Sequence, residues 1–101
     1  MKKFFVIGNP ISHSLSPELH NFWIKKNKIN AVYDKIKLEE SELKGFINKL
    51  RNEEIHGINV TVPFKNKVIK YLDKLSLEVE TTDSVNTIYK SGNDIIGHNT
   101  D

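Results

Sequence analysis

The segment that decides the fold is Gly57-Ile58-Asn59-Val60-Thr61-Val62-Pro63-Phe64-Lys65. Its apolar residues alternate with Asn59 and Thr61, and this period of two predicts an extended strand with both polar side chains on one face. Pro63 ends the strand and keeps the residue before it extended. The segment therefore predicts a buried strand that carries a polar pair to its end.

A helical spacing of apolar residues follows the proline, at Phe64, Val68, Ile69 and Leu72. It predicts a helix that begins near Pro63 and ends near residue 75. Lys65 would then leave the first turn of a helix, beside the strand end that carries Asn59 and Thr61. Two neutral hydrogen-bonding groups and an amine suit a polyol site with a candidate acid/base, because strand ends of open sheets favour ligands. The alternative is that Asn59 and Thr61 form only a solvated strand face and that Lys65 is a solvated helix residue.

The composition indicates one small folded domain. The chain has 101 residues, of which 38% are hydrophobic and 28% are charged. Its 15 basic and 13 acidic residues give a net charge of +2, and the basic residues are spread along the chain, which argues against nucleic-acid binding. There is no cysteine, no apolar run of transmembrane length and no signal-peptide pattern. We therefore expect a cytoplasmic protein with no membrane or nucleic-acid partner.

The N-terminal part predicts a strand, a polar loop and a helix. Residues 4–7 are all apolar, as in a strand buried on both faces of a parallel sheet. Ser16, followed by proline and Glu18, is a good helix start. The spacing of Leu15, Leu19, Phe22 and Trp23 predicts one helical face, with Trp23 in the core.

The loop before that helix is a candidate anion site. Ser14 and Ser16 offer hydroxyl donors beside a helix N-terminus, where free N–H groups favour a carboxylate. The alternative is that Ser16 only caps the helix and Ser14 only completes a turn. His13 and His20 lack partners at metal-ligand spacing, so we interpret them as structural and expect no metal site.

The middle of the chain predicts a strand and a helix with structural roles only. Residues 31–38 have the pattern of an edge-like strand, and a helix is predicted from Ser41, with an apolar face made by Leu43, Phe46, Ile47 and Leu50. Another strand opens at Ile55 and leads into the 57–65 segment. The acidic passage 78–83 is expected to be a turn or loop.

The C-terminal part predicts a hairpin, with strands at 85–89 and 94–98 joined by a short connection that contains glycine and asparagine. The resulting order, βαβαβαββ, predicts an α/β three-layer sandwich: a mostly parallel sheet with one antiparallel hairpin pair and helices on both faces. The five glycines form no G-x-G-x-x-G, so no dinucleotide-phosphate turn is encoded.

Four separated motifs resemble those of shikimate dehydrogenases. They are the segment 9–21 (NPISHSLSPELHN), the G-x-N-V-T-x-P-x-K signature at 57–65, V-N-T at 85–87 and G-x-N-T-D at 97–101. The resemblance spans the chain but covers only the substrate-binding half of such an enzyme. It implies that residues 1–101 are the substrate-binding domain and that a C-terminal, NADP-binding Rossmann domain is absent from this chain.

The resemblance implies an oxidoreductase of aromatic amino acid (chorismate) biosynthesis. Such an enzyme interconverts shikimate and 3-dehydroshikimate with NADP as cofactor. The enzyme would be active at full length, and these 101 residues alone are expected to be inactive. A quinate/shikimate dehydrogenase of broader specificity is the near alternative, and a non-catalytic module that binds shikimate-like carboxylates is the alternative from another class.

Site residues follow from the same motifs. Ser14 and Ser16 would hold the shikimate carboxylate, while Asn59, Thr61, Asn86 and Asp101 would bind ring hydroxyls or shape the pocket. The catalytic pair would be Lys65 and Asp101. Free lysine, with a pKa of about 10.4, is a poor base at neutral pH, so we expect Asp101 mainly to orient Lys65 and the hydroxyl, with Lys65 as proton carrier.

One position departs from the family pattern. Asp83 and Ser84 precede V-N-T where the family usually has glycine and alanine. Asp83 is therefore expected to alter the turn that positions Asn86 and to add negative charge near an anionic ligand.

Overall fold

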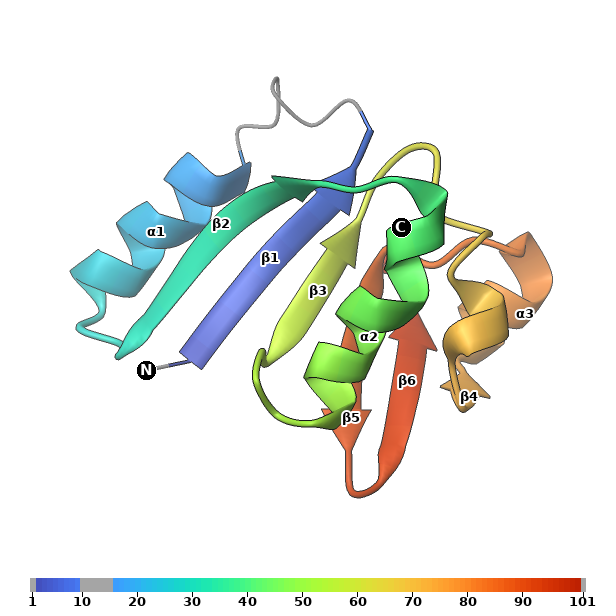
Figure 1. The fold of residues 1–101 in the computed structure, drawn as a ribbon. Helices are drawn as coiled ribbons and strands as arrows, with labels where there is room; N and C mark the ends of the chain where they lie inside the picture. The colour runs from blue at the N-terminus through green and yellow to red at the C-terminus, as the bar shows by residue number, and fades with distance from the viewer. Residues whose placement is uncertain (1, 10–15, 101) are drawn as a thin grey trace.

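The computed structural model describes residues 2–9 and 16–100, apart from the side chains of residues 16, 17 and 19. Its strands form one sheet in the order β2-β1-β3-β5-β6-β4 (Figure 1). The strands are β1 (Lys2–Gly8), β2 (Ala31–Lys37), β3 (Gly57–Val60), β4 (Lys74–Leu75), β5 (Thr87–Ser91) and β6 (Asp94–His98). The helices are α1 (Ser16–Lys26), α2 (Leu43–Arg51) and α3 (Leu77–Thr82), with short 3₁₀ turns η1 (Glu40–Glu42) and η2 (Ile69–Tyr71).

The sheet is mixed, as the sequence predicts. β1 pairs in parallel with β2 and with β3, and β4 pairs in parallel with β6. β5 is antiparallel to both of its neighbours, β3 and β6. The predicted hairpin is therefore confirmed as β5 and β6, joined at a turn in which Gly92 has a φ of 62°.

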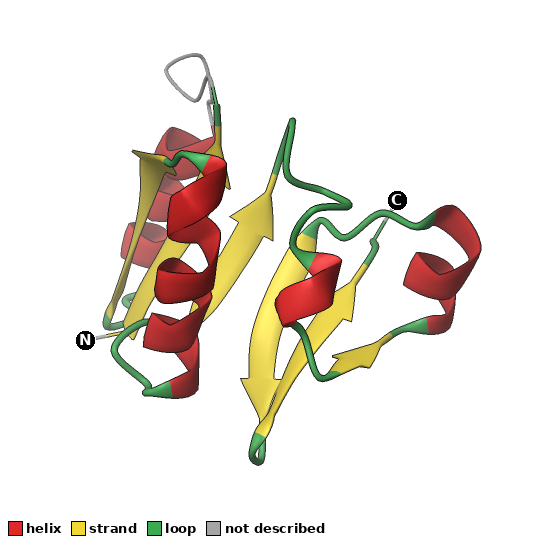
Figure 2. Cartoon of the chain, turned by 45° about the vertical axis from the view of Figure 1, so that its right-hand side comes forward, coloured by secondary structure: helices red, strands yellow, loops and turns green. Residues whose placement is uncertain are grey.

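Helix α2 covers one face of the sheet (Figure 2). The predicted apolar face is buried and packs in one cluster with Ile7, Ile58 and Val60; its members are Leu43, Phe46, Ile47 and Leu50. Burying each side chain of this size contributes about 1.5–3 kcal/mol. The helix begins two residues later than predicted, because the turn η1 occupies residues 40–42.

Helix α1 lies on the opposite face, but the predicted role of Trp23 is wrong. Trp23 is 50% exposed and Phe22 is 59% exposed. The helix instead meets the sheet through Asn21, whose side chain exchanges two hydrogen bonds with the main chain of Tyr33, and through Ile24. These two bonds fix the rotation of the helix, so the indole ring faces outward beneath the Lys26 ammonium, 4.9 Å from the ring centre.

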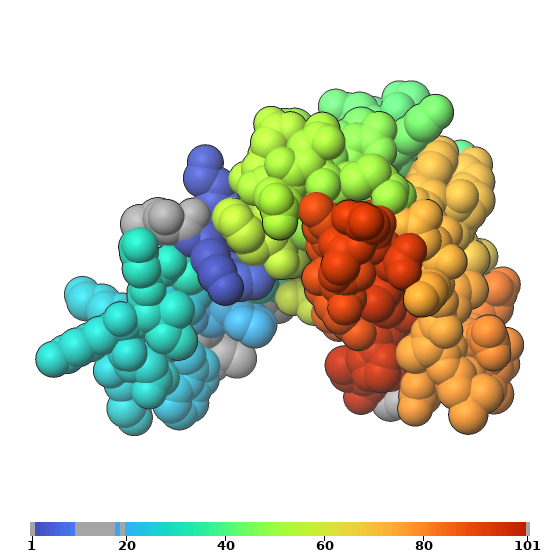
Figure 3. Space-filling model, turned by 90° about the horizontal axis from the view of Figure 1, so that it is seen from below, coloured from blue at the N-terminus to red at the C-terminus, as the bar shows by residue number. Residues whose placement is uncertain are grey.

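The molecule is arched when it is viewed from below (Figure 3). The limb made by α1 and β2 stands on one side of a hollow, and the limb made by β5, β6 and the 70–82 segment stands on the other. Helices thus lie on both faces of the sheet, as expected, but they leave part of the α1 face uncovered.

The helix predicted after Pro63 is not formed. Residues 65–68 make consecutive turns and only η2 follows them. The Lys65 carbonyl accepts a hydrogen bond from Val85 N at 2.7 Å, and Ile69 N, the amide four residues on, donates instead to Asn66 O at 3.4 Å. Phe64 and Val68 are nevertheless buried, as their apolar spacing indicates.

The acidic passage predicted as a loop is helix α3. The Ser76 side chain caps it by accepting from Val79 N, and Val79 is buried. Glu78 and Glu80 lie in its first turn, where the helix dipole favours negative charge. Sequence polarity therefore concealed a short helix that is held by its cap and one buried contact.

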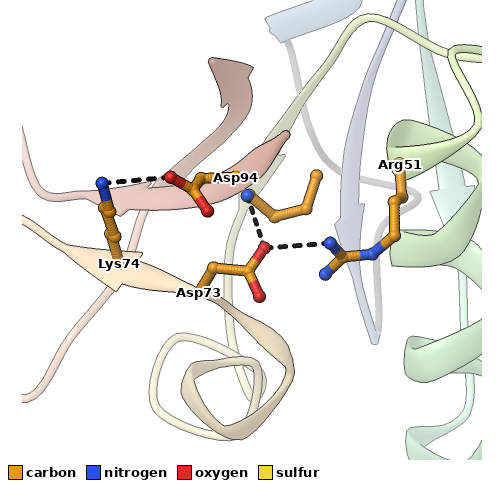
Figure 4. Close-up of polar contacts among 5 residues, drawn as sticks. Arg51, Asp73, Lys74 and Asp94 are labelled. Carbon is orange, nitrogen blue, oxygen red and sulfur yellow. Dashed lines mark hydrogen bonds and ion pairs between the residues drawn. The ribbon is translucent and has the colours of Figure 1, made fainter. Parts of the chain in front are cut away.

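A carboxylate ties the 72–75 segment to the rest of the molecule (Figure 4). Asp73 accepts from Arg51 Nη1 of α2 at 3.0 Å and from Ile95 N of β6 at 2.7 Å. These two bonds hold the pKa of the Asp73 carboxyl below its usual range, and the bond from the Ile95 amide has the larger effect. Beside it, Lys74 pairs with Asp94 at 3.0 Å.

No helix within residues 2–9 and 16–100 is long and apolar enough to cross a membrane.

Candidate active site

The candidate site lies where the ends of β1 and β3 meet the start of β5 and the end of β6. Because β5 is antiparallel, the residue that precedes it lies beside the end of β3. Val60 N donates to Asn86 O at 2.9 Å, and Asn86 N donates to His98 O at 3.1 Å. The reversal of one strand therefore gathers three segments that are distant in the sequence at one edge of the sheet.

Asn59 is half-buried on the polar face of β3, where its side chain is bonded at both ends. Its Oδ1 accepts from the Tyr33 hydroxyl at 2.7 Å. Its Nδ2 lies 3.3 Å from both Asn86 O and Thr87 Oγ1. The amide is thus held across the sheet between β2 and β5, with part of its surface accessible.

Asn86 binds the segment that follows β6. Its Nδ2 donates to Thr100 Oγ1 at 3.0 Å and to Asn99 Oδ1 at 3.4 Å. Its Oδ1 accepts from Thr100 N at 3.2 Å and from Thr87 Oγ1 at 2.9 Å. Asn99 Nδ2 also donates to Thr82 Oγ1 at 3.1 Å, so residues 99–100 are held by Asn86 together with Thr82 of α3.

Thr61 and Lys65 flank the end of β3. Thr61 N donates to Ile7 O at 3.0 Å, which extends the pairing of β3 with β1 past the end of the strand. Lys65 is half-buried and lines a cavity of about 250 Å³. The other lining residues are Val62, Pro63, Asn66, Asp83 and Ser84.

Asp83 adopts a backbone conformation that glycine, the residue expected here from the resemblance, adopts most easily. It has φ 55° and ψ 37°, the left-handed conformation, and its N–H closes α3 by donating to Val79 O at 2.7 Å. Glycine adopts this conformation without steric cost, and aspartate tolerates it better than most residues do. The left-handed turn before Val85 and Asn86 is thus formed with aspartate, and the carboxylate lines the same cavity as Lys65.

Three predicted site residues cannot be placed. Ser14 and Asp101 lie outside the described residues, and Ser16 begins α1 without a described side chain. Of the remaining predicted residues, Asn59 and Asn86 are in contact, and Thr61 and Lys65 lie on the segment that leaves β3 beside them. The roles assigned to all these residues stay predictions.

Sequence reasoning gave no role to Tyr33, and none to Thr87 or Thr100 beyond membership of a motif. Tyr33 is 4% exposed, and burial raises the pKa of its phenol to about 12. The signal available in the sequence was weak: a tyrosine inside a polar, edge-like strand. Only the register of three strands shows that it reaches Asn59.

The described residues include no cluster of potential metal ligands. His20 stacks on the Tyr33 ring at a centroid distance of 4.1 Å. The described segments around Gly8, Gly45, Gly57, Gly92 and Gly97 likewise supply no dinucleotide-phosphate turn.

Comparison with known proteins identifies the family. Residues 6–88 match the family described as "Shikimate dehydrogenase substrate binding domain". This chain belongs to that family. Shikimate dehydrogenase (NADP(+)) of Pelagibacter ubique is 62% identical over 100 residues, which are 99% of this chain and 38% of that protein. The enzyme of Pyrococcus furiosus is 43% identical over 100 residues, 99% of this chain and 36% of its own length.

Solved members of the family share the fold. Shikimate 5-dehydrogenase from Listeria monocytogenes, solved with shikimate and NAD, is 36% identical with a TM-score of 0.91, over 97% of this chain and 34% of that one. The Thermus thermophilus enzyme, solved with shikimate, is 31% identical with a TM-score of 0.92, over 99% and 38%. The chain thus spans well under half the length of these relatives.

Proposed function

We propose that this chain is the substrate-binding part of an NADP-dependent enzyme that interconverts shikimate and 3-dehydroshikimate. One observation carries the proposal: Asn59 and Asn86, joined through Thr87, place neutral amide and hydroxyl groups at a strand-end edge, beside the segment that leads from β3 to Lys65. Neutral amides and hydroxyls suit ring hydroxyls, and a nearby amine suits an alcohol that must lose its proton. The names of the relatives and the shikimate in two solved neighbours support the substrate.

The residues of this chain have three tasks in the proposal. Ser14 and Ser16 bind the carboxylate of the substrate, and Asn59, Thr61 and Asn86 bind or frame its hydroxyls. Lys65 takes the proton of the C3 hydroxyl during oxidation and returns it during reduction, while Asp101 orients both groups. The nicotinamide cofactor, NADP, is bound mainly by the C-terminal domain that the resemblance implies. A cytoplasmic location, expected from the sequence, belongs to the same proposal.

Steady-state kinetics of the complete protein test this function. We expect turnover of shikimate with NADP⁺, and quinate oxidation of similar efficiency would favour the broader enzyme instead. In the Lys65→Ala variant we expect kcat to fall by about 10²–10⁴-fold, the range typical of a lost general acid/base, with little change in substrate affinity.

Lys67→Ala is the matched control for that variant. Lys67 lies two residues away, but its ammonium pairs with Glu40 at 2.6 Å and is exposed. We expect its kinetics to equal those of the wild type. Near-normal turnover in Lys65→Ala with retained affinity would refute the role of Lys65. If the complete wild-type protein binds shikimate but never turns it over, the alternative of a non-catalytic binding module would be correct.

A further inference from the structure

Tyr33 reaches the candidate site from the far side of β1. In the strand register it pairs with Phe4, and Phe4 also pairs with Gly57, two residues before Asn59. Its ring packs with Val6 and stacks on His20 with an interplanar angle of 9°. Asn21 holds its main chain through both N–H and C=O, at 2.9 and 2.6 Å. The phenol is therefore fixed by contacts on its backbone and on its ring.

Hydrogen-bonding chemistry determines the orientation of Asn59. One end of its amide faces Asn86 O, a carbonyl that can only accept, so that end must be Nδ2. Oδ1 consequently faces the Tyr33 hydroxyl, which must donate. A phenylalanine in place of Tyr33 would leave Asn59 Oδ1 without that donor and would leave the Asn59 amide free to turn.

The bond from Tyr33 begins a chain of donors that all point in one direction. The Tyr33 hydroxyl donates to Asn59, Asn59 Nδ2 to Thr87 Oγ1, Thr87 Oγ1 to Asn86 Oδ1, and Asn86 Nδ2 to Thr100 Oγ1. Hydrogen bonds in such a chain polarise one another and strengthen together. The order of the site thus extends from β2 to the residue before Asp101.

We propose that Tyr33 is a positioning residue for the substrate site, acting through its hydrogen bond to Asn59. It leaves the second lone pair of Asn59 Oδ1 available to a substrate hydroxyl and fixes where that acceptor points. This inference rests on the proposed function. Since the raised pKa of the phenol keeps it protonated, the donor is present across the working pH range of an enzyme.

The test is the Tyr33→Phe variant of the complete enzyme, which removes one oxygen and keeps the ring against His20. We expect KM for shikimate to rise about threefold to tenfold, the effect of one neutral hydrogen bond, with kcat within about twofold, because binding is lost equally before and during reaction. Tyr89→Phe is the control: Tyr89 is 41% exposed on β5, so its kinetics should not change.

A double-mutant cycle separates positioning from a general effect on folding. In an Asn59→Ala background, Tyr33→Phe should leave KM unchanged, because the group that it positions is already absent. The Asn59 side-chain NH₂ signals in the NMR spectrum, assigned by their loss in Asn59→Ala, should shift in Tyr33→Phe and not in Tyr89→Phe.

Each outcome decides a different statement. A wild-type enzyme that is inactive on shikimate overturns the proposed function and this inference with it. An active enzyme whose KM is unaffected by Tyr33→Phe overturns this inference alone. Equal KM effects of Tyr33→Phe with and without Asn59 also overturn it, because they would show that Tyr33 acts through the fold.

Discussion

At Gly97, adding one methyl group should lower the free energy of unfolding of the protein. It lies on β6 between β5 and β4, immediately before the residues that Asn86 binds. A Cβ at this position would be 2.5 Å from Leu72 Cδ1 and 3.1 Å from Val85 Cγ2. Carbon atoms in contact normally lie about 3.5–4.0 Å apart, so Gly97→Ala requires both neighbours to move.

The size of the effect follows from two opposing contributions. Leu72 is half-buried and can change rotamer, whereas Val85 is fully buried and cannot retreat without disturbing the core. Overpacking of this kind costs about 1–3 kcal/mol, and the reduced freedom of the unfolded chain offsets about 0.4–1 kcal/mol. We therefore expect Gly97→Ala to lower the free energy of unfolding by about 1–2 kcal/mol.

Gly45 provides a control with the opposite sign. It is exposed in the first turn of α2, and a Cβ there would meet nothing within 4 Å. Gly45→Ala should raise the free energy of unfolding by about 0.5–1 kcal/mol, since alanine is the better helix former. Equilibrium denaturation of both variants measures the difference.

A rescue variant tests the cause. Leu72→Ala should lower the free energy of unfolding less in the Gly97→Ala variant than in the wild type. The reason is that the methyl group added at position 97 fills part of the cavity that the lost leucine leaves. If Gly97→Ala stabilises the protein as Gly45→Ala does, or if the two changes at Gly97 and Leu72 are simply additive, the close approach of the 72–75 segment to β6 is refuted.

Two further predictions concern charged residues near the site and the core. Asp83→Gly should raise the free energy of unfolding by about 0.5–1 kcal/mol, because φ 55° suits glycine; a value equal to or below that of the wild type in chemical denaturation would contradict this. The Asp73 carboxyl has a lowered pKa, so its stabilising bonds to Ile95 N and Arg51 are complete above its ordinary pKa of about 3.8 and are lost as pH falls through the lowered value. The stability advantage of wild type over Asp73→Asn should therefore be constant near neutral pH and shrink below about pH 4 in acid titrations; an advantage that persists at pH 2 would exclude this role.

The spacing of apolar residues and the turn residues correctly predicted several elements of the fold. Alternation placed β3, the α2 face is as buried as its spacing indicates, and the Gly92 turn joins β5 to β6. The main-chain hydrogen bonds of each of these elements are made within the element or with a neighbouring element, against which its hydrophobic face packs.

The failures have a common physical origin, which is a hydrogen bond from a distant residue. Asn21 binds the main chain of Tyr33 and thereby rotates α1, so that the spacing of Trp23 does not decide its burial. Val85 N donates to the carbonyl of Lys65, in a segment that forms turns although its apolar spacing favours a helix. Sequence spacing records neither partner, because both lie more than ten residues away.

The candidate site was predictable only as a set of residue types. The motifs identified Asn59, Thr61, Lys65 and Asn86, but not the order in which they are connected. That order depends on the reversal of β5 and on the reach of Tyr33 across β1, and both are properties of the assembled sheet. The side chain of Tyr33 consequently had no visible role before the register was known.

The failed helix prediction also explains how the lysine comes to the site. In a regular helix after Pro63, the carbonyl of Lys65 would be bonded within the helix and the residue could point anywhere on its circumference. Here that carbonyl is bonded to Val85 N at 2.7 Å, one residue before Asn86. The backbone of Lys65 is thus anchored to the segment that carries Asn86 and leads into β5. The departure from helical geometry therefore accompanies a direct backbone hydrogen bond between the segment of the proposed proton carrier and the segment of Asn86.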